Sequence, residues 1–109
     1  MGLSEPLSVS EALLSTDNYV ALGAIDIGTA LTLVYTLTVA TNNLKWTVYG
    51  ANVAAFTDEV VVQAEATVNV GALGTYSTTQ AVYRYYRAKI KAAVGAAQGT
   101  GTLTGVSKG

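Results

Sequence analysis

Hydrophobic and polar residues alternate over much of this chain, with the period of a β-strand. The clearest case runs from Leu31 to Val39, where threonine fills most of the positions between large apolar residues. Successive side chains of a strand point to opposite faces, so this segment predicts a half-buried strand with threonine on its wetter face. The apolar positions are Leu31, Leu33, Tyr35, Leu37 and Val39.

Turn residues divide the remaining chain into similar short strands. Residues 19–26 predict a strand bent at Gly23, and residues 44–50 predict a hairpin strand with Trp46 on its buried face. Further strands are expected within 60–70, over 83–93 and over 100–107, with glycine-rich turns at 71–74 and 95–99. This spacing of turns predicts an all-β fold, an antiparallel β-sandwich or jelly-roll-like barrel over residues 19–109.

Residues 1–18 differ from the rest and are expected to form a short N-terminal arm. Ser8 and Glu11 have the spacing of a capping box, which favours a short helical turn packed on the domain. Alternatively, the segment is extended and docks on a neighbouring subunit through its apolar residues. These interface candidates are Leu3, Leu7, Val9, Leu13 and Leu14.

Two segments were considered for targeting or membrane insertion. The first six residues lack a basic stretch followed by an apolar one, so no secretory signal is expected. The apolar run 19–40 is long enough to cross a bilayer, but Asp26, two glycines and threonine at most alternate positions from Thr32 to Thr38 favour strands. We therefore expect no membrane association.

Composition removes most routes to catalysis. The chain has no cysteine and no histidine, which excludes thiolate nucleophiles, disulfides and the commonest proton shuttle and metal ligand. The formal net charge of -1 gives no general attraction to nucleic acid, and no nucleic-acid partner is expected. The sequence therefore predicts a protein that is not an enzyme and carries no cofactor.

The carboxylates and glycines give little indication of a catalytic or metal site. Asp58 and Glu59 are the only adjacent acids, and neighbours on a strand face opposite ways, so a solvated loop edge is the simplest interpretation. A calcium site built from Asp58 or Asp26 with loop carbonyls stays open. The glycines of residues 95–101 are followed by no helix and no lysine, which favours a hairpin turn over a phosphate loop.

The strand at 83–91 holds four of the six basic residues of the chain. A period of two places Arg84, Tyr86, Ala88, Ile90 and Ala92 on one face, with Tyr86 and Ile90 as core candidates and Arg84 at the mouth, where it can reach water or a carboxylate. The opposite face is a basic and aromatic stripe, and its members are further interface candidates: Tyr83, Tyr85, Arg87, Lys89 and Lys91. Such a stripe suits an exposed face protected by lysine, a protein interface, a sugar site or a nucleic-acid site.

Three segments resemble those of small β-sandwich virion proteins of tailed bacteriophages. They are Leu44-Lys45-Trp46-Thr47-Val48-Tyr49-Gly50-Ala51-Asn52, then Phe56-Thr57-Asp58, then Tyr83-Arg84-Tyr85-Tyr86-Arg87. The order also resembles the second half of discoidin-type jelly rolls, and the likeness covers residues 44–108. Ala88 replaces the usual bulky aliphatic residue, and no ligand loop of the discoidin modules is recognisable.

The resemblance implies a structural virion protein, in particular a capsid decoration or cement protein. Such a protein would be a homo-oligomer, for example a trimer, that binds the major capsid protein or other virion subunits, and it would be located in the virion after assembly in the host cytoplasm. Head–tail connector, tail and head-fibre roles stay open. One alternative is a carbohydrate-binding module whose aromatic platforms come from Trp46, Tyr49, Tyr76, Tyr83 and Tyr85. Another is a subunit of a non-viral, β-rich surface assembly.

Overall fold

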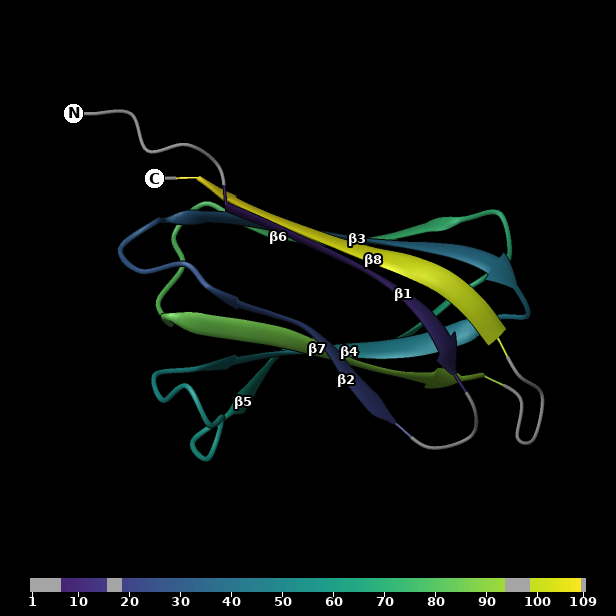
Figure 1. Cartoon of the computed structure of the whole chain (residues 1–109), viewed down its shortest axis with the longest axis horizontal. Coiled ribbons are helices and arrows are strands. Elements are labelled where there is room, and N and C mark those ends of the chain that lie inside the picture. The colour runs from purple at the N-terminus through teal and green to yellow at the C-terminus, as the bar shows by residue number, and fades with distance from the viewer. Residues whose placement is uncertain (1–6, 16–18, 94–98, 109) are drawn as a thin grey trace.

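The strands of this chain form two antiparallel sheets that pack face to face (Figure 1). The computed structural model describes the backbone of residues 7–15, 19–93 and 99–108, and the side chains of the last two ranges. The first sheet has the order β1-β8-β3-β6, with β1 Leu7–Ser15, β8 Gly99–Lys108, β3 Thr32–Thr41 and β6 Leu73–Thr78. The second has the order β2-β7-β4-β5, with β2 Val20–Asp26, β7 Tyr85–Ala92, β4 Leu44–Ala51 and β5 Val60–Val68. The predicted antiparallel β-sandwich is confirmed, and this order is that of an eight-stranded jelly roll.

The core lies between the two sheets, and the predicted alternation places its side chains. Every second residue of β3, β4 and β7 is buried, and Trp46 is only 1% exposed. The largest fully buried side chains are Trp46, Tyr35, Tyr86, Leu33, Leu37, Leu44, Ile90 and Leu103. No helix long and apolar enough to cross a bilayer occurs in the part of the chain that the structure describes.

The inner face of β8 is unusual because its residues are small. Four of its five buried positions are glycine or serine, and the fifth is Leu103. A Cβ added at Gly99 would lie 2.4 Å from Leu44 Cδ2, so the leucine of the opposite sheet occupies the space that a larger residue would need. The missing side chains let the two sheets approach closely here.

Strand β2 bends at Gly23, as predicted from the sequence. Its register with β7 shifts between Leu22 and Ile25, which is a β-bulge, and Gly23 has a φ of +69°. The Tyr35 hydroxyl donates a hydrogen bond to the Gly23 carbonyl from the other sheet. The bulge is therefore tied to the opposite layer of the sandwich.

The N-terminal segment differs from one of its two predicted conformations. Residues 7–15 form β1, which pairs antiparallel with β8 from Leu7–Ser107 to Ser15–Gly99, so the helical turn predicted from Ser8 and Glu11 is wrong. A nine-residue β-ladder satisfies the hydrogen bonds of more backbone amides and carbonyls than a single helical turn does, so the strand is the more stable conformation. Half of the predicted arm is thus a strand of the first sheet, and its docking on a neighbouring subunit stays a prediction.

Three further predictions need correction. Strand β6 occupies Leu73–Thr78, where only a turn at 71–74 was expected. Leu31 is 56% exposed because β3 begins one residue later, at Thr32. Strand β7 begins at Tyr85 rather than at Tyr83, which changes the position of the Tyr83 side chain. The glycine-rich turn predicted at 95–99 lies mostly outside the described residues.

Ser107 provides a test of the packing inside β8. Its side chain is buried, and its hydroxyl has no hydrogen-bond partner among the described residues. Burying a hydroxyl that has no hydrogen-bond partner is energetically unfavourable. We therefore expect Ser107→Ala to leave the free energy of unfolding unchanged or to raise it by up to about 1 kcal/mol. Urea unfolding measures this, with Thr104→Ala on the outer face of the same strand as control. A clear loss of stability in Ser107→Ala alone would contradict it.

Candidate interface

The outer face of the second sheet carries the stripe predicted from the sequence of β7. Arg87, Lys89 and Lys91 alternate with buried residues, and their partners on β4 are Tyr49, Thr47 and Lys45. Side chains of directly paired residues share one face, so the two strands combine their polar groups. We call this surface the basic-aromatic face, formed by Tyr19, Lys45, Tyr49, Phe56, Glu59, Arg87, Lys89 and Lys91.

Each cation of the β7 stripe lies over an aromatic ring of the same chain. The Arg87 guanidinium carbon is 4.3 Å from the centre of the Phe56 ring. Lys89 Nζ is 4.7 Å from the centre of the Tyr49 ring, and Lys91 Nζ is 4.8 Å from that of Tyr19. These cation–π contacts hold long side chains that would otherwise be mobile.

Glu59 links two of these cations. Its carboxylate accepts hydrogen bonds from Arg87 Nε and Nη2, at 3.1 and 2.9 Å, and from Lys89 Nζ at 2.6 Å. Partial burial of Glu59 works against its charged form, but the hydrogen bonds from Lys89 and Arg87 outweigh that burial and hold the pKa of the carboxyl below its usual range. The carboxylate is therefore a fixed part of the surface, not the solvated loop edge expected from the sequence.

The loop at residues 52–59 positions both Phe56 and Glu59. Asp58 accepts hydrogen bonds from the amides of Asn52 and Val53, at 3.1 and 3.3 Å, which closes the loop on itself. Phe56 adopts a φ of +59°, and its ring is buried on the outside of the sheet, edge-on to Tyr85 at 6.3 Å. Asp58 thus holds the loop, and no group of three metal-binding side chains occurs among the described residues to extend it to the calcium site considered above.

The residues before β7 separate into different roles. Tyr83 was predicted on the basic stripe, but its ring packs edge-on against Tyr86, with the centres 6.2 Å apart, and it lies against Gly50 beside the core. This prediction is wrong because β7 begins after Tyr83, so the strand period does not reach it. Arg84, predicted to reach water or a carboxylate, binds Asp26 through two hydrogen bonds of 2.9 and 3.0 Å.

Asp26 has a structural role at the end of β2. The hydrogen bonds from Arg84 and from the Gly28 amide hold the pKa of the Asp26 carboxyl below its usual range. They fix the turn after β2 to the residue that precedes β7, so the second carboxylate considered for calcium is also paired within the chain.

The described interface candidates of the N-terminal arm do not lie in the sheet that carries the basic-aromatic face. Leu3 lies outside the described residues. The other four are on β1, where Leu7, Val9, Leu13 and Leu14 are paired with Ser107, Gly105, Gly101 and Thr100 of β8. The described part of the arm, β1, and the β7 stripe therefore belong to different sheets.

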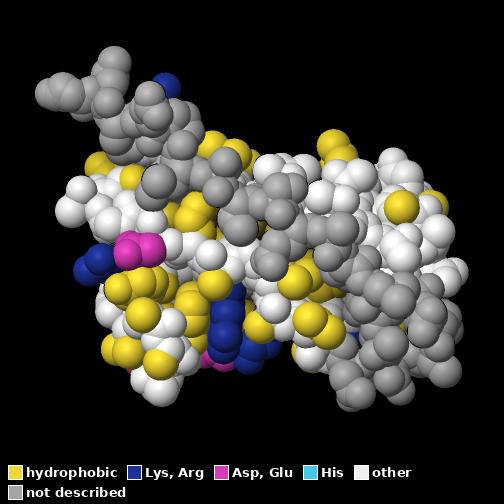
Figure 2. Space-filling view, viewed as in Figure 1, with side chains coloured by type: hydrophobic (Ala, Val, Ile, Leu, Met, Phe, Trp, Pro, Cys, Tyr) yellow, Lys and Arg dark blue, Asp and Glu magenta, His cyan; other side chains and the backbone are white. Residues whose placement is uncertain are grey.

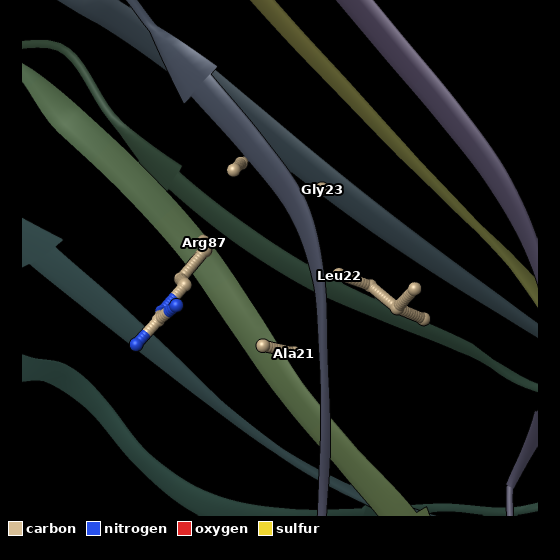
Figure 3. A pocket seen from close by; sticks show the side chains of 5 residues that line it. Ala21, Leu22, Gly23 and Arg87 are labelled. Carbon is tan, nitrogen blue, oxygen red and sulfur yellow. The ribbon is translucent and has the colours of Figure 1, made fainter. Parts of the chain in front are cut away.

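A pocket of about 180 Å³ adjoins the basic-aromatic face beside β2. Its walls are Ala21, Leu22, Gly23, Ala24 and Arg87. Figure 3 shows the Arg87 and Leu22 side chains pointing in opposite directions, so Leu22 contributes little to the outer surface. Because Arg87 is already bound to Glu59, its guanidinium is not free to bind a small ligand in this pocket.

The positions of the aromatic rings also argue against the sugar site proposed from the sequence. Trp46 is buried, as the alternation predicts, and Tyr83 packs beside the core. Lys89 lies over Tyr49, and Arg84 lies 5.2 Å from the centre of the Tyr85 ring. Since sugars stack on exposed ring faces, these tyrosines are partly occupied by their own chain.

Cations outnumber carboxylates on and beside the basic-aromatic face, so its net charge is positive. Four cations, Lys45, Arg87, Lys89 and Lys91, stand beside two carboxylates, Glu59 and Glu65. Lys45 is directly opposite Lys91, and its Nζ is 3.9 Å from Glu65, which is a loose ion pair. In Figure 2, the Lys and Arg side chains gather between two hydrophobic groups in the lower part of the view, where Figure 1 places the second sheet.

The outer face of the first sheet is rich in threonine, in contrast to the basic-aromatic face of the second sheet. Threonine recurs across three strands in the same register, with Thr36 of β3 paired to Thr104 of β8 and to Thr75 of β6. The next row contains Thr102, Thr38 and Leu73. The sequence predicted threonine on the wet face of β3, but the rows depend on a strand order that the sequence does not encode locally.

Comparison with known proteins supports the fold and leaves the family open. No family model and no curated protein matches this chain. Among solved structures, a protein of the Bacillus endospore appendages, described as a novel family of disulfide-linked pili, has a TM-score of 0.63 at 14% identity, covering 99% of this chain and 91% of that one. The SPBc2 prophage-derived protein YomS has a TM-score of 0.60 at 8% identity, covering 100% and 99%. At these identities the likeness is one of fold.

Proposed function

We propose that this chain is a non-enzymatic structural subunit of a tailed-phage virion, most specifically a capsid decoration or cement protein. The observation that supports this best is the basic-aromatic face, whose cations are held by rings and a carboxylate of the same chain. A surface fixed in this way loses little side-chain entropy when it meets another protein, so it suits a subunit that works by covering area.

The fold likeness to a prophage-derived protein and to a protein of pili supports a structural role. In this proposal the chain forms a homo-oligomer, for which a trimer is one arrangement, and binds the major capsid protein in the virion. The positive excess on the basic-aromatic face favours an acidic surface on the partner. Because this chain has no cysteine, its contacts cannot be disulfide links like those described for the appendages.

Fractionated phage particles test the proposal. Particles from a culture whose phage genome carries this gene are separated into filled heads, empty shells and tails, and each fraction is analysed by mass spectrometry. We expect the chain in both head fractions, in a constant ratio to the major capsid protein. Its presence in tails alone would contradict the decoration role and support the connector, tail or fibre alternatives. Its absence from every fraction would overturn a virion role.

A further inference from the structure

Four strands lie at the edges of the two sheets, and three of them carry features that discourage pairing with another chain. Strand β2 contains the bulge at Gly23 and ends at Asp26. Strand β5 has two register shifts against β4 and contains Glu65. Strand β1 contains Glu11 in its sequence. Bulges and charges are the usual means by which natural sheets protect their edges.

Strand β6 has neither kind of protection. Its register with β3 runs without a shift from Leu33–Thr78 to Thr38–Leu73. No charged residue and no proline occurs in the sequence between Glu65 and Arg84, a stretch that includes all of β6. No described strand pairs with its outer side. An uncharged, regular edge of this kind is a template for an added strand.

Exposed apolar side chains flank β6 at both of its ends. Val70 and Leu73, at its start, are 49% and 65% exposed. Val82 is 75% exposed beyond the other end, where the Ala81 amide bonds to the carbonyl of Leu31, itself 56% exposed. Single exposed apolar residues are common, but here each end of one open edge carries a pair of them.

We propose that β6 pairs antiparallel with β6 of a second copy of this chain. A two-fold axis midway between the two strands brings the start of each β6 to the end of its partner, so the apolar pair at one end meets that at the other. Among the four edges, only another β6 would bring no acidic side chain into the contact. The result is one continuous eight-stranded sheet, built from the four-stranded first sheets of two copies.

This contact joins two chains, whereas a trimer would need another surface. It concerns self-association in solution and does not depend on the proposed virion role. Two six-residue strands bury less area than a permanent interface, so the dimer should dissociate on dilution. Of the registers that keep outward side chains opposite each other, the two with the longest overlap are centred on Thr75 and on Tyr76, and in the second Thr75 faces Ser77.

Single cysteines test the pairing cleanly because the natural chain has none. In the first register, Thr75→Cys forms a disulfide with its own copy. In the second, a disulfide forms only when Thr75→Cys is mixed with Ser77→Cys. The matched control is Thr102→Cys, on the same outer face but on β8, inside the sheet. We expect a covalent dimer from one of the two arrangements and none from the control.

Sedimentation equilibrium of the full chain provides the second measurement. The unmodified chain should show a monomer–dimer equilibrium. Thr75→Lys should raise the dissociation constant of the dimer by at least about tenfold, because the two lysine charges then lie opposite or close to each other across the contact. Thr102→Lys should leave it unchanged. A monomer at every concentration, or equal yields of disulfide from Thr75→Cys, the mixture and Thr102→Cys, would overturn the proposal. Larger assemblies that Thr75→Lys does not weaken would overturn it as well.

Discussion

Replacing Gly23 with alanine should lower the free energy of unfolding by about 2–3 kcal/mol, through two effects at one position. Its φ of +69° lies in the left-handed region, which strains any residue with a Cβ. The added Cβ would also lie 2.6 Å from Cδ2 of the fully buried Leu103, so that side chain would have to shift within the core. Urea unfolding monitored by the fluorescence of Trp46 measures the loss.

Gly28 supplies the matched control. It also has a positive φ, +58°, but a Cβ there would meet no atom within 4 Å. Gly28→Ala therefore carries the backbone strain alone, and we expect a loss of about 1 kcal/mol. Equal losses for the two variants would show that Leu103 yields freely, which would contradict the tight packing described for this side of the sandwich.

Replacing Glu59 with glutamine should cost about 1–2 kcal/mol at neutral pH, because Arg87 and Lys89 lose the charge that both of them bind. The Glu59 side chain is only 19% exposed, so solvent compensates the two cations poorly. Glu65→Gln is the control. That carboxylate is 43% exposed and 3.9 Å from Lys45, and its removal should change stability by less than about 0.5 kcal/mol.

The pH dependence of this difference follows from the lowered pKa of Glu59. The carboxyl titrates at a lower pH in the folded chain than in the unfolded chain, so the ion pairs contribute fully above the unfolded pKa, about 4.3. Their contribution decreases as the pH falls through the folded pKa. The difference in stability between the natural chain and Glu59→Gln should therefore shrink progressively as the pH falls below the unfolded pKa, in unfolding curves measured from pH 7 to pH 2.5. A constant difference over that range would show that the cost comes from packing and not from charge.

The fold was predictable wherever large apolar residues alternate with polar ones. Strands β3 and β4 and the buried side of β7 follow from that period alone, as does the burial of Trp46. Strand β6 was missed because its inward positions begin with Gly74, which gives no hydrophobic signal. Strand β1 was assigned partly to a helical turn because Ser8 and Glu11 satisfy a local rule, whereas its pairing with β8 is a contact between opposite ends of the chain.

The candidate interface was predictable in part for the same reason. The positions of Arg87, Lys89 and Lys91 on one face follow from the strand period. Phe56 and Glu59 were not predictable, because they come from an irregular loop whose turns have no period. Their contacts with Arg87 change the interpretation of the surface, because the cations already have partners within the chain before another protein binds.

The position of β8 has a consequence for biosynthesis. This strand lies between β1 and β3 and pairs with both, yet it is the last of the eight described strands in the order of synthesis. Until residues 99–108 emerge, the first-made strand has no neighbour in its sheet and the roll stays open. We therefore expect the nascent sandwich to stay unfolded until β8 has emerged, and a stop codon before Gly99 to yield a chain whose first sheet cannot close.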